Sequence, residues 1–214
     1  MSVIHHRPSI DPFPPTELAI WRSLSTAVIS DELNRSHTMD CGIRPIGAVG
    51  EVVAGHALTV RAMVGDNLAI HHAVAAAEPG SILVIDAGGV GPTAVWGGIL
   101  HRAAELRGVT AVIVDGCVRD SAEIVGSSMV CYARGTVPAG PQKSWGGEIN
   151  SRVAAGGCVV TAGDLIVADS DGVVVVAAAD RAAVRERCEA RVKTEQAILE
   201  RLEAGETTVE IFGL

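Results

Sequence analysis

The sequence has few basic residues and no run of them. Its 17 lysine and arginine residues are outnumbered by 25 aspartate and glutamate residues, which gives a formal net charge of −8. Nucleic acids and anionic membrane surfaces bind proteins through clustered positive charge, and the sequence contains no such cluster. We therefore expect neither nucleic acid nor a membrane as a partner, and we expect the ligand to be a small molecule or another protein.

Paired cysteines and long apolar runs are also missing. The five cysteines are scattered without a CxxC spacing, so the sequence predicts neither a zinc knuckle nor a disulfide framework. No segment approaches the roughly 18 apolar residues that a membrane-spanning helix needs. The first residues, MSVIHHRPSIDPFPP, contain no apolar signal core. Together these absences favour a reduced, cytoplasmic setting.

Hydrophobic residues make up 48% of the 214 residues, which suits one domain with a large core. We predict an extended N-terminal arm over residues 1–15, where prolines are frequent, followed by a single domain over residues 16–214. Helical spacing of apolar residues marks 16–35, 67–77 and 97–108. A long helix is expected from Asp180, a plausible N-cap, to Ala204, because Gly205 follows as a stop signal.

Short segments rich in valine and isoleucine lie between and after these helical segments. Each is bounded by glycine or proline turns, which is typical of strands. The segments are 52–63, 81–86, 109–116, 158–168 and 172–177. Strand and helix alternate in the middle of the chain, whereas strands cluster towards its end, so the pattern predicts an α/β fold with a mixed sheet, flanking helices and a long C-terminal helix.

The stretch VDGCVRD, residues 114–120, ends a continuous apolar strand with two opposite charges, Arg119 and Asp120. In open sheets with crossover helices, ligands gather beyond the carboxyl ends of the strands. Adjacent residues do not face each other on a helix and point to opposite sides of a strand, so we expect the two charges to have separate partners. The alternative is a surface arginine followed by an aspartate that caps a helix over residues 121–126.

A second candidate site is AVWGGILHRAAELRG, residues 94–108. Inside a helix Gly97 and Gly98 would each cost roughly 1 kcal/mol, so we expect them in the first turn, where backbone amides point outward. Such a turn binds a carboxylate or a phosphate, and close packing of the glycines against the sheet is the alternative. Ile99 and Leu100 are expected to belong to the apolar face of this helix.

Among the histidines, His71 and His72 lie in a predicted helix, where adjacent positions diverge by about 100° and do not chelate one metal easily. One of the two is expected to face the core. His101, near the glycine turn, is expected to be packed rather than catalytic.

The predicted C-terminal helix carries an apolar stripe with one carboxylate in it. Glu195 occupies a position of the stripe that apolar residues would otherwise fill. It is either a carboxylate at the edge of a partly wet seam or a carboxylate delivered into a site, including a neighbouring subunit's. The apolar members of the stripe are Val184, Cys188, Val192, Leu199 and Leu202.

Several segments together resemble the RraA-like family. They are GDNLAIHHAV, PGSILVID, AVWGGILHRAAELRGVTAVIVDGCVRD, AGDLIVADSDGVVVV and ERLEAGETTVEIFGL. The resemblance extends over residues 16–214 and points especially to the family's 4-hydroxy-4-methyl-2-oxoglutarate and 4-carboxy-4-hydroxy-2-oxoadipate aldolase branch. It implies a layered β/β/α domain, similar to swivelling domains, that assembles as homotrimers or homohexamers with active sites between subunits.

For function, the resemblance implies a divalent-metal-dependent (class II) pyruvate aldolase of aromatic catabolism that also decarboxylates oxaloacetate. Asp120 would hold Mg²⁺ or Mn²⁺, largely through water, and Arg119 would bind the pyruvyl group of a small 2-oxo acid. Residues 97–100 would supply backbone amides to the substrate carboxylate, and Glu195 matches an acidic residue contributed by an adjacent subunit. Many relatives have a glutamate where this chain has Gly98, so the water-positioning role of that glutamate does not transfer directly.

A chemical argument from the residues also favours a metal. Cleavage of a carbon–carbon bond beside a pyruvyl ketone generates an enolate, which is stabilised by a Schiff-base lysine or by a cation. Lys143, in a polar loop, and Lys193, on the exposed side of the C-terminal helix, are the only lysines, and neither is expected to be buried enough for imine chemistry. A hard cation held by one carboxylate and water fits instead.

Two functions of other classes remain as alternatives. The family is named for an inhibitor of ribonuclease E, so one alternative is a regulator that binds and inhibits a ribonuclease by protein contact. Regulator-type members lose the aspartate after the arginine, and this chain keeps Asp120, which favours the enzyme. Some members have been labelled methyltransferases, but the sequence has no glycine-rich cofactor loop followed by an acidic ribose ligand.

Overall fold

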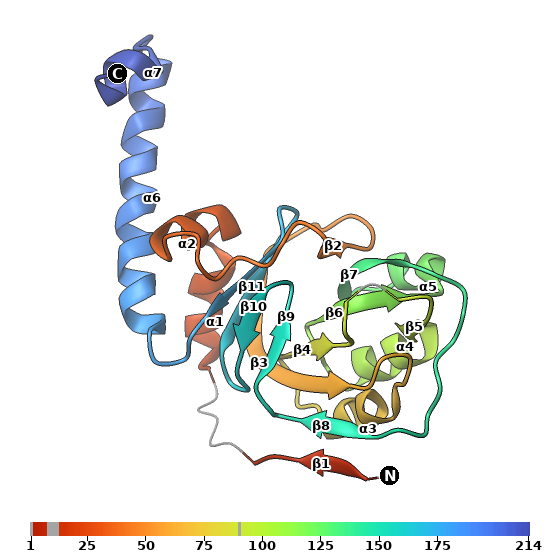
Figure 1. Ribbon diagram of the computed structural model, residues 1–214. Helices are drawn as coiled ribbons and strands as arrows, with labels where there is room; N and C mark the ends of the chain where they lie inside the picture. The colour runs from red at the N-terminus through yellow and green to blue at the C-terminus, as the bar shows by residue number, and fades with distance from the viewer. Residues whose placement is uncertain (1, 8–12, 90) are drawn as a thin grey trace.

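The computed structural model describes residues 2–7, 13–89 and 91–214, which form a mixed sheet with helices packed around it (Figure 1). The strands are β1 (Val3–His5), β2 (Arg44–Pro45), β3 (Val53–Ala62), β4 (Ser81–Asp86), β5 (Ala94–Trp96), β6 (Ala111–Val118), β7 (Val130–Thr136), β8 (Gly147–Ile149), β9 (Val153–Ala155), β10 (Cys158–Val160), β11 (Leu165–Ala168) and β12 (Val173–Val176). The helices are α1 (Pro15–Arg22), α2 (Thr26–Glu32), α3 (Leu68–Ala76), α4 (Gly98–Leu106), α5 (Ser121–Val125), α6 (Arg181–Glu203) and α7 (Thr208–Phe212).

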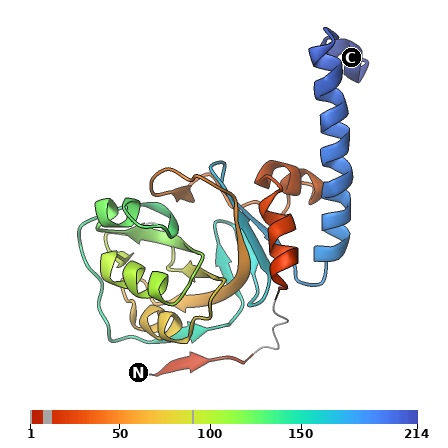
Figure 2. The ribbon, with the colours of Figure 1, turned by 180° about the vertical axis from the view of Figure 1, so that it is seen from behind.

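The centre of the sheet is parallel. Strands β3, β4, β6 and β7 lie side by side in that order, and the helices α3, α4 and α5 that connect them cover one face (Figure 2). Strand β3 also pairs in the antiparallel sense with β11 and β8, so the predicted mixed sheet is confirmed. Every residue of β6 is buried, which explains the continuous apolar run in the sequence.

Apolar side chains fill three layers across the molecule. Alternate residues of a strand point to opposite faces, so Val112 of β6 packs with the helices α3 to α5, whereas Ile113 packs with the hairpin of β9 and β10. A third core, which contains Trp21 and Ile29, joins β11 and β12 to α1, α2 and α6. The predicted layered β/β/α arrangement is therefore confirmed.

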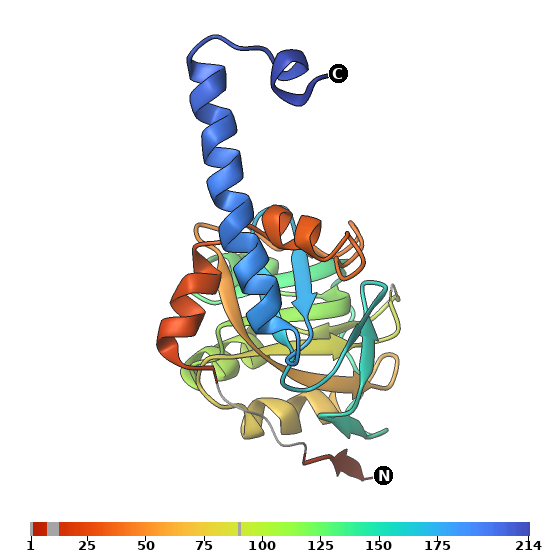
Figure 3. The same ribbon diagram turned by 90° about the vertical axis from the view of Figure 1, so that its left-hand side faces the viewer.

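The long C-terminal helix is confirmed as α6. Asp180 holds its N-cap position, although the Asp180 side chain makes no capping hydrogen bond. Figure 3 shows that α6 packs on the body only through its first part and then rises away from it, with α7 at its end. Val184 and Cys188 are buried, whereas Val192 and Leu199 of the same stripe are 41% and 52% exposed. Val192 and Leu199 are therefore only partly covered by the described part of their own chain.

The N-terminal segment contributes to the sheet. Strand β1 pairs in parallel with β8, and Pro15 already begins α1. The part of the predicted extended arm that covers residues 8–12 lies outside the described residues. Among the helices described here, none combines the length and the apolar character needed to cross a membrane.

Asp115, inside the stretch VDGCVRD, has a structural role. Its carboxylate pairs with Arg134 Nε and accepts a hydrogen bond from the Gly156 amide at 2.8 Å. The two terminal nitrogens of Arg134 bind Asp40 at 3.0 and 2.9 Å, and this contact holds the pKa of the Asp40 carboxyl below its usual range. Arg134 thus joins β6 and β7 to the loop at Asp40. The carboxylate of Asp115 is therefore used in structural contacts.

Candidate active site

A cavity of about 70 Å³ lies beyond the carboxyl ends of β5 and β6, next to α3 and α4. The predicted residues Gly97, Ile99, Leu100, Arg119 and Asp120 all line it. The structure therefore brings together the two segments 94–108 and 114–120, which were predicted as separate candidate sites. This is the edge of the sheet at which the chain order predicts a ligand site.

The charges of Arg119 and Asp120 contact each other, so the prediction that they have only separate partners is wrong. Arg119 Nε lies 3.5 Å from Asp120 Oδ2. The prediction assumed an extended or right-handed helical backbone, but Asp120 has φ 58° and ψ 41°, a left-handed conformation that is uncommon outside glycine. The two side chains are 40% and 38% exposed, so their pairing adds little stability.

Asp120 does not act as a helix cap. It holds the N-cap position of α5, yet its side chain makes no capping hydrogen bond. Instead, Asp120 Oδ2 accepts a hydrogen bond from the Gly98 amide at 3.1 Å, at the first turn of α4. The strained backbone and the missing cap both indicate that this carboxylate is positioned for the cavity.

Gly97 and Gly98 lie at the start of α4, so the prediction that they form the first turn of a helix is confirmed. Gly97 is the N-cap of α4, and Gly98 is its first helical residue. A Cβ at Gly97 would stand 2.7 Å from Asp120 Oδ2 and 3.0 Å from Arg119 Cγ, so a side chain here would force both of these side chains to shift. The Gly98 amide is already bound by Asp120, whereas helix geometry leaves the amides of Ile99 and Leu100 without intrahelical acceptors.

The side chain of Ile99 does not belong to the apolar face of α4, which corrects the prediction. Ile99 is 81% exposed beside the cavity, whereas Leu100 is 5% exposed and packs in the core. The spacing predicted the helix correctly, but Ile99 and Leu106 of the predicted apolar face are exposed. Beside it, the carboxylate of Glu123 occupies the space that a side chain at Gly98 would take, so the glutamate of many relatives has no room here unless Glu123 moves.

Substitution of Gly97 by alanine is expected to lower turnover on the order of 100-fold, because the new methyl group displaces the Arg119 and Asp120 side chains from their places. Steady-state kinetics of the purified variant tests this. Gly98→Ala is the matched control: its methyl group meets only the end of the flexible Glu123 side chain, so the loss is expected to be much smaller. Equal losses in the two variants would contradict the spatial argument.

Three further polar residues, which were not predicted as site residues, line the cavity: Asn67, His71 and Lys143. Asn67 is the N-cap of α3, and His71 lies one helical turn along it. Lys143 belongs to a loop anchored by the fully buried Asp66, whose Oδ2 accepts hydrogen bonds from the Ser144 and Trp145 amides at 2.6 and 3.1 Å. In the sequence, the four-residue spacing of Asn67 and His71 indicates that their side chains lie on the same side of a helix.

The three histidines His71, His72 and His101 lie in different surroundings. His71 is half-buried and faces the cavity, and burial, followed by the charge of Lys143, lowers its pKa from the usual value. The neighbouring His72 is exposed and meets the ring of His5 edge-on at 5.7 Å. His101 is packed as predicted, with its Nδ1 accepting a hydrogen bond from Trp96 Nε1 at 3.2 Å.

Glu195 is not at the cavity of its own chain. It lies on the outer part of α6, where it pairs with Arg191 at 2.9 Å. Figure 1 shows α6 on the other side of the body from α4 and α5. A single chain therefore brings Arg119, Asp120 and the glycine turn together but leaves Glu195 apart.

The donor set at the cavity fits a hard cation. Within the part of the chain that the structure describes, no group of three or more His, Cys, Asp or Glu side chains is arranged to bind a metal ion. Asp120 offers one half-exposed carboxylate. Mg²⁺ retains much of its hydration and often takes one or two carboxylates, so these residues suit a cation held mainly through water.

Fold and site together define a class of protein, a layered α/β domain that holds an arginine–aspartate pair against the first turn of a helix. Within this class the chain belongs to the RraA-like family, because residues 26–175 match the family described as Aldolase/RraA.

Similar proteins carry different names. A protein of Halalkalibacterium halodurans named "Putative 4-hydroxy-4-methyl-2-oxoglutarate aldolase" is 36% identical over 156 residues, 73% of this chain and 74% of its own length. A solved structure of an uncharacterized protein from Pseudomonas syringae superposes with a TM-score of 0.83 at 26% identity, covering 94% of this chain and 95% of the other. The RNA-processing inhibitor RraA from Thermus thermophilis superposes with a TM-score of 0.65 at 28% identity, covering 71% and 92%.

Proposed function

We propose that the protein is a divalent-metal-dependent pyruvate aldolase that cleaves 4-hydroxy-4-methyl-2-oxoglutarate or 4-carboxy-4-hydroxy-2-oxoadipate and also decarboxylates oxaloacetate. The observation that carries the proposal is the Arg119–Asp120 pair, held against the first turn of α4 beside a small cavity. The name of the H. halodurans relative supports it. The cavity volume of about 70 Å³ suits the compact pyruvyl end of such substrates.

In this proposal, Asp120 would hold Mg²⁺ or Mn²⁺, largely through water. Such a cation would supply Lewis-acid stabilisation of negative charge on the keto oxygen. Arg119 binds the pyruvyl group through charge-assisted hydrogen bonds that strengthen as that charge grows. The amides of Ile99 and Leu100, at the positive end of the α4 dipole, bind the substrate carboxylate.

The proposal also includes an assembly of three or six chains in which a neighbouring subunit delivers Glu195. Two observations support this part. Glu195 is remote from the cavity of its own chain, and the apolar stripe that contains it is exposed at Val192 and Leu199. An apolar seam flanked by charged side chains is suited to contact with another copy of the chain.

A pyruvate-release assay tests the proposed function. Wild-type protein is incubated with each of the two 4-hydroxy-2-oxo acids and with oxaloacetate, with and without Mg²⁺. We expect pyruvate from oxaloacetate and from at least one hydroxy acid, only when the cation is present. Inactivity on all three substrates would contradict the proposal and favour a ribonuclease regulator of the kind that the Thermus structure represents.

A further inference from the structure

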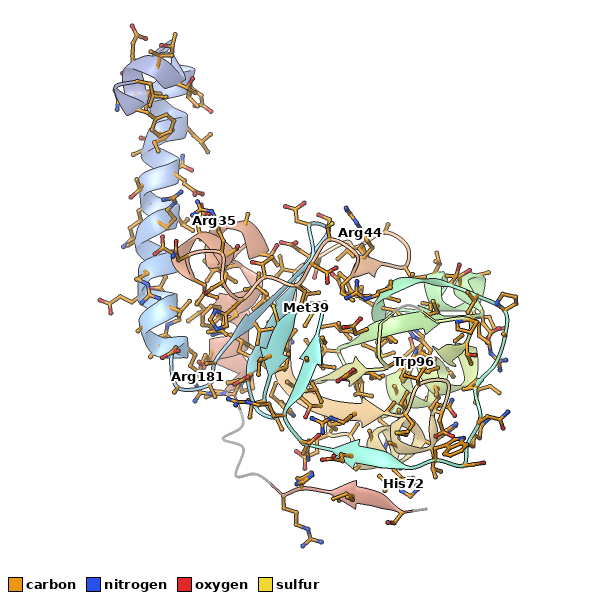
Figure 4. All side chains as sticks on the ribbon, in the orientation of Figure 1. Arg35, Met39, Arg44, His72, Trp96 and Arg181 are labelled. Atoms are coloured by element: carbon orange, nitrogen blue, oxygen red, sulfur yellow. The ribbon has the colours of Figure 1, made fainter. Side chains whose placement is uncertain are left out.

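The cavity has a second polar wall that the proposed chemistry of Arg119 and Asp120 leaves unused. This wall is formed by Asn67 and His71, which lie one turn apart, the His71 amide donating a hydrogen bond to the Asn67 carbonyl at 3.1 Å. Both side chains therefore project from the same side of α3. Trp96 of β5, labelled in Figure 4, lines the same cavity.

Each of the two side chains presents a buried polar atom that has no hydrogen-bond partner among the described residues. These atoms are Asn67 Oδ1 and His71 Nε2. Asn67 is only 5% exposed, and its Nδ2 donates to the Val95 carbonyl at 3.1 Å, which fixes the amide so that Oδ1 is left over. Leaving a buried polar atom unpaired costs roughly 1 to 3 kcal/mol, so two such atoms on one cavity wall indicate a ligand group that satisfies them.

The position of Asn67 is also unusual for its residue type. Asparagine is favoured at helix N-caps because its side chain binds a free amide of the first turn. Asn67 holds the N-cap position of α3, but its side chain makes no such bond. Asp120 at the N-cap of α5 likewise makes no capping bond. In both cases the polar side chain is directed to the cavity instead of to its own helix.

The state of the imidazole suits proton acceptance. The charged and titratable groups that share the cavity or lie beside His71 are Lys143, His72, Arg119 and Asp120. Burial is the main cause that lowers the pKa of His71, and Lys143 and His72 act in the same direction. A neutral imidazole has one ring nitrogen free to accept a proton.

We propose that His71 is the general base of the aldol cleavage and accepts the proton of the substrate's C4 hydroxyl at Nε2, with Asn67 beside it on the same wall. The inference rests on the proposed aldolase function. Asn67 Oδ1 is an acceptor only, so it requires a donor group from the ligand or from water. In this arrangement the C4 hydroxyl lies at His71 and the pyruvyl end lies at Arg119.

The electrons and protons of the step balance. The hydroxyl proton moves to His71, the C4–O bond becomes a carbonyl, and the C3–C4 bond breaks. Its electron pair passes to C3 and into the keto group, which gives the enolate of pyruvate and a second 2-oxo acid. The protonated imidazole then returns the proton to C3, so both products leave and the side chain regains its starting state.

Comparison of two reactions tests this inference, because oxaloacetate has no C4 hydroxyl to deprotonate. In His71→Gln we expect cleavage of the hydroxy acid to fall on the order of 100-fold or more, the usual contribution of a general base. Decarboxylation of oxaloacetate is expected to fall far less, so the ratio of the two rates is the quantity to measure. In His71→Gly, added imidazole is expected to restore part of the cleavage rate.

The matched control is His72→Gln, which alters the adjacent histidine on the same helix. His72 is exposed, contacts His5 and lies at the outer edge of the body near β1 (Figure 4). Its ratio of rates is expected to equal that of the wild type. An unchanged ratio of rates in His71→Gln, or a failure of imidazole to rescue His71→Gly, would overturn the role of His71. If the wild-type protein releases no pyruvate from any substrate, the proposed aldolase function itself is overturned.

Discussion

Asp120→Asn is expected to lose metal-dependent pyruvate release by on the order of 1,000-fold, which corresponds to about 4 kcal/mol of transition-state stabilisation. The amide cannot supply the anionic oxygen that a hard cation prefers. Asparagine tolerates the left-handed backbone found at this position, so the variant is expected to fold and assemble normally. Asp120→Ala should show the same loss of activity with an additional small loss of stability, because alanine is strained there.

The measurement is pyruvate release over a series of Mg²⁺ concentrations, together with the melting temperature of each variant. Asp171→Asn is a suitable control, since it removes an exposed aspartate in the turn between β11 and β12. Wild-type turnover in the presence of excess chelator would disprove the metal assignment. Full activity of Asp120→Asn would show that another group holds the cation.

Arg119→Lys is expected to reduce turnover by on the order of 100- to 1,000-fold although it preserves the charge. A guanidinium offers a planar pair of donors to a carboxylate or keto oxygen, and an ammonium does not reproduce that geometry. The size of the loss follows from the roughly 3 to 4 kcal/mol that one oxyanion donor contributes. Separate values of kcat and KM show whether the guanidinium acts in the transition state or in substrate binding.

Arg102→Lys provides the comparison for this experiment. Arg102 is an exposed arginine of α4 that pairs with Glu105, so its replacement is expected to leave kcat unchanged. Unchanged turnover of Arg119→Lys would return Arg119 to the role of a surface residue. A loss that appears only in KM would limit Arg119 to binding the substrate.

Much of the fold was predictable because its signals are local. The buried strands β4 and β6 appear as continuous apolar runs, and α6 has a cap position, a long helical pattern and a glycine stop. Strands β7 and β8 were not predicted, since VCYARGT contains an arginine and a glycine and GEI has only three residues. Such strands depend on pairing with distant segments, which a single sequence does not display.

The candidate site was predictable to the extent that it lies at a strand end. Arg119 and Asp120 were selected because they follow a buried strand and Gly97 because it opens a helix, and the structure places all three at one cavity. Asn67 and His71 were not selected because they reach the cavity from a helix that precedes β4 in the chain. The contact between Arg119 and Asp120 depends on the left-handed backbone conformation of Asp120, which no pattern in the sequence predicts.

The outward course of α6 has a consequence for how this protein would be handled. If Glu195 reaches the cavity of a neighbour, the reactive unit is a contact between chains, and its population follows mass action. Specific activity per chain would then fall when the protein is diluted below the dissociation constant of the assembly. If the exposed Val192 and Leu199 of α6 form the contact between chains, the dissociation constant depends on them. A protein with a shortened α6 would then need a higher concentration to reach the same rate.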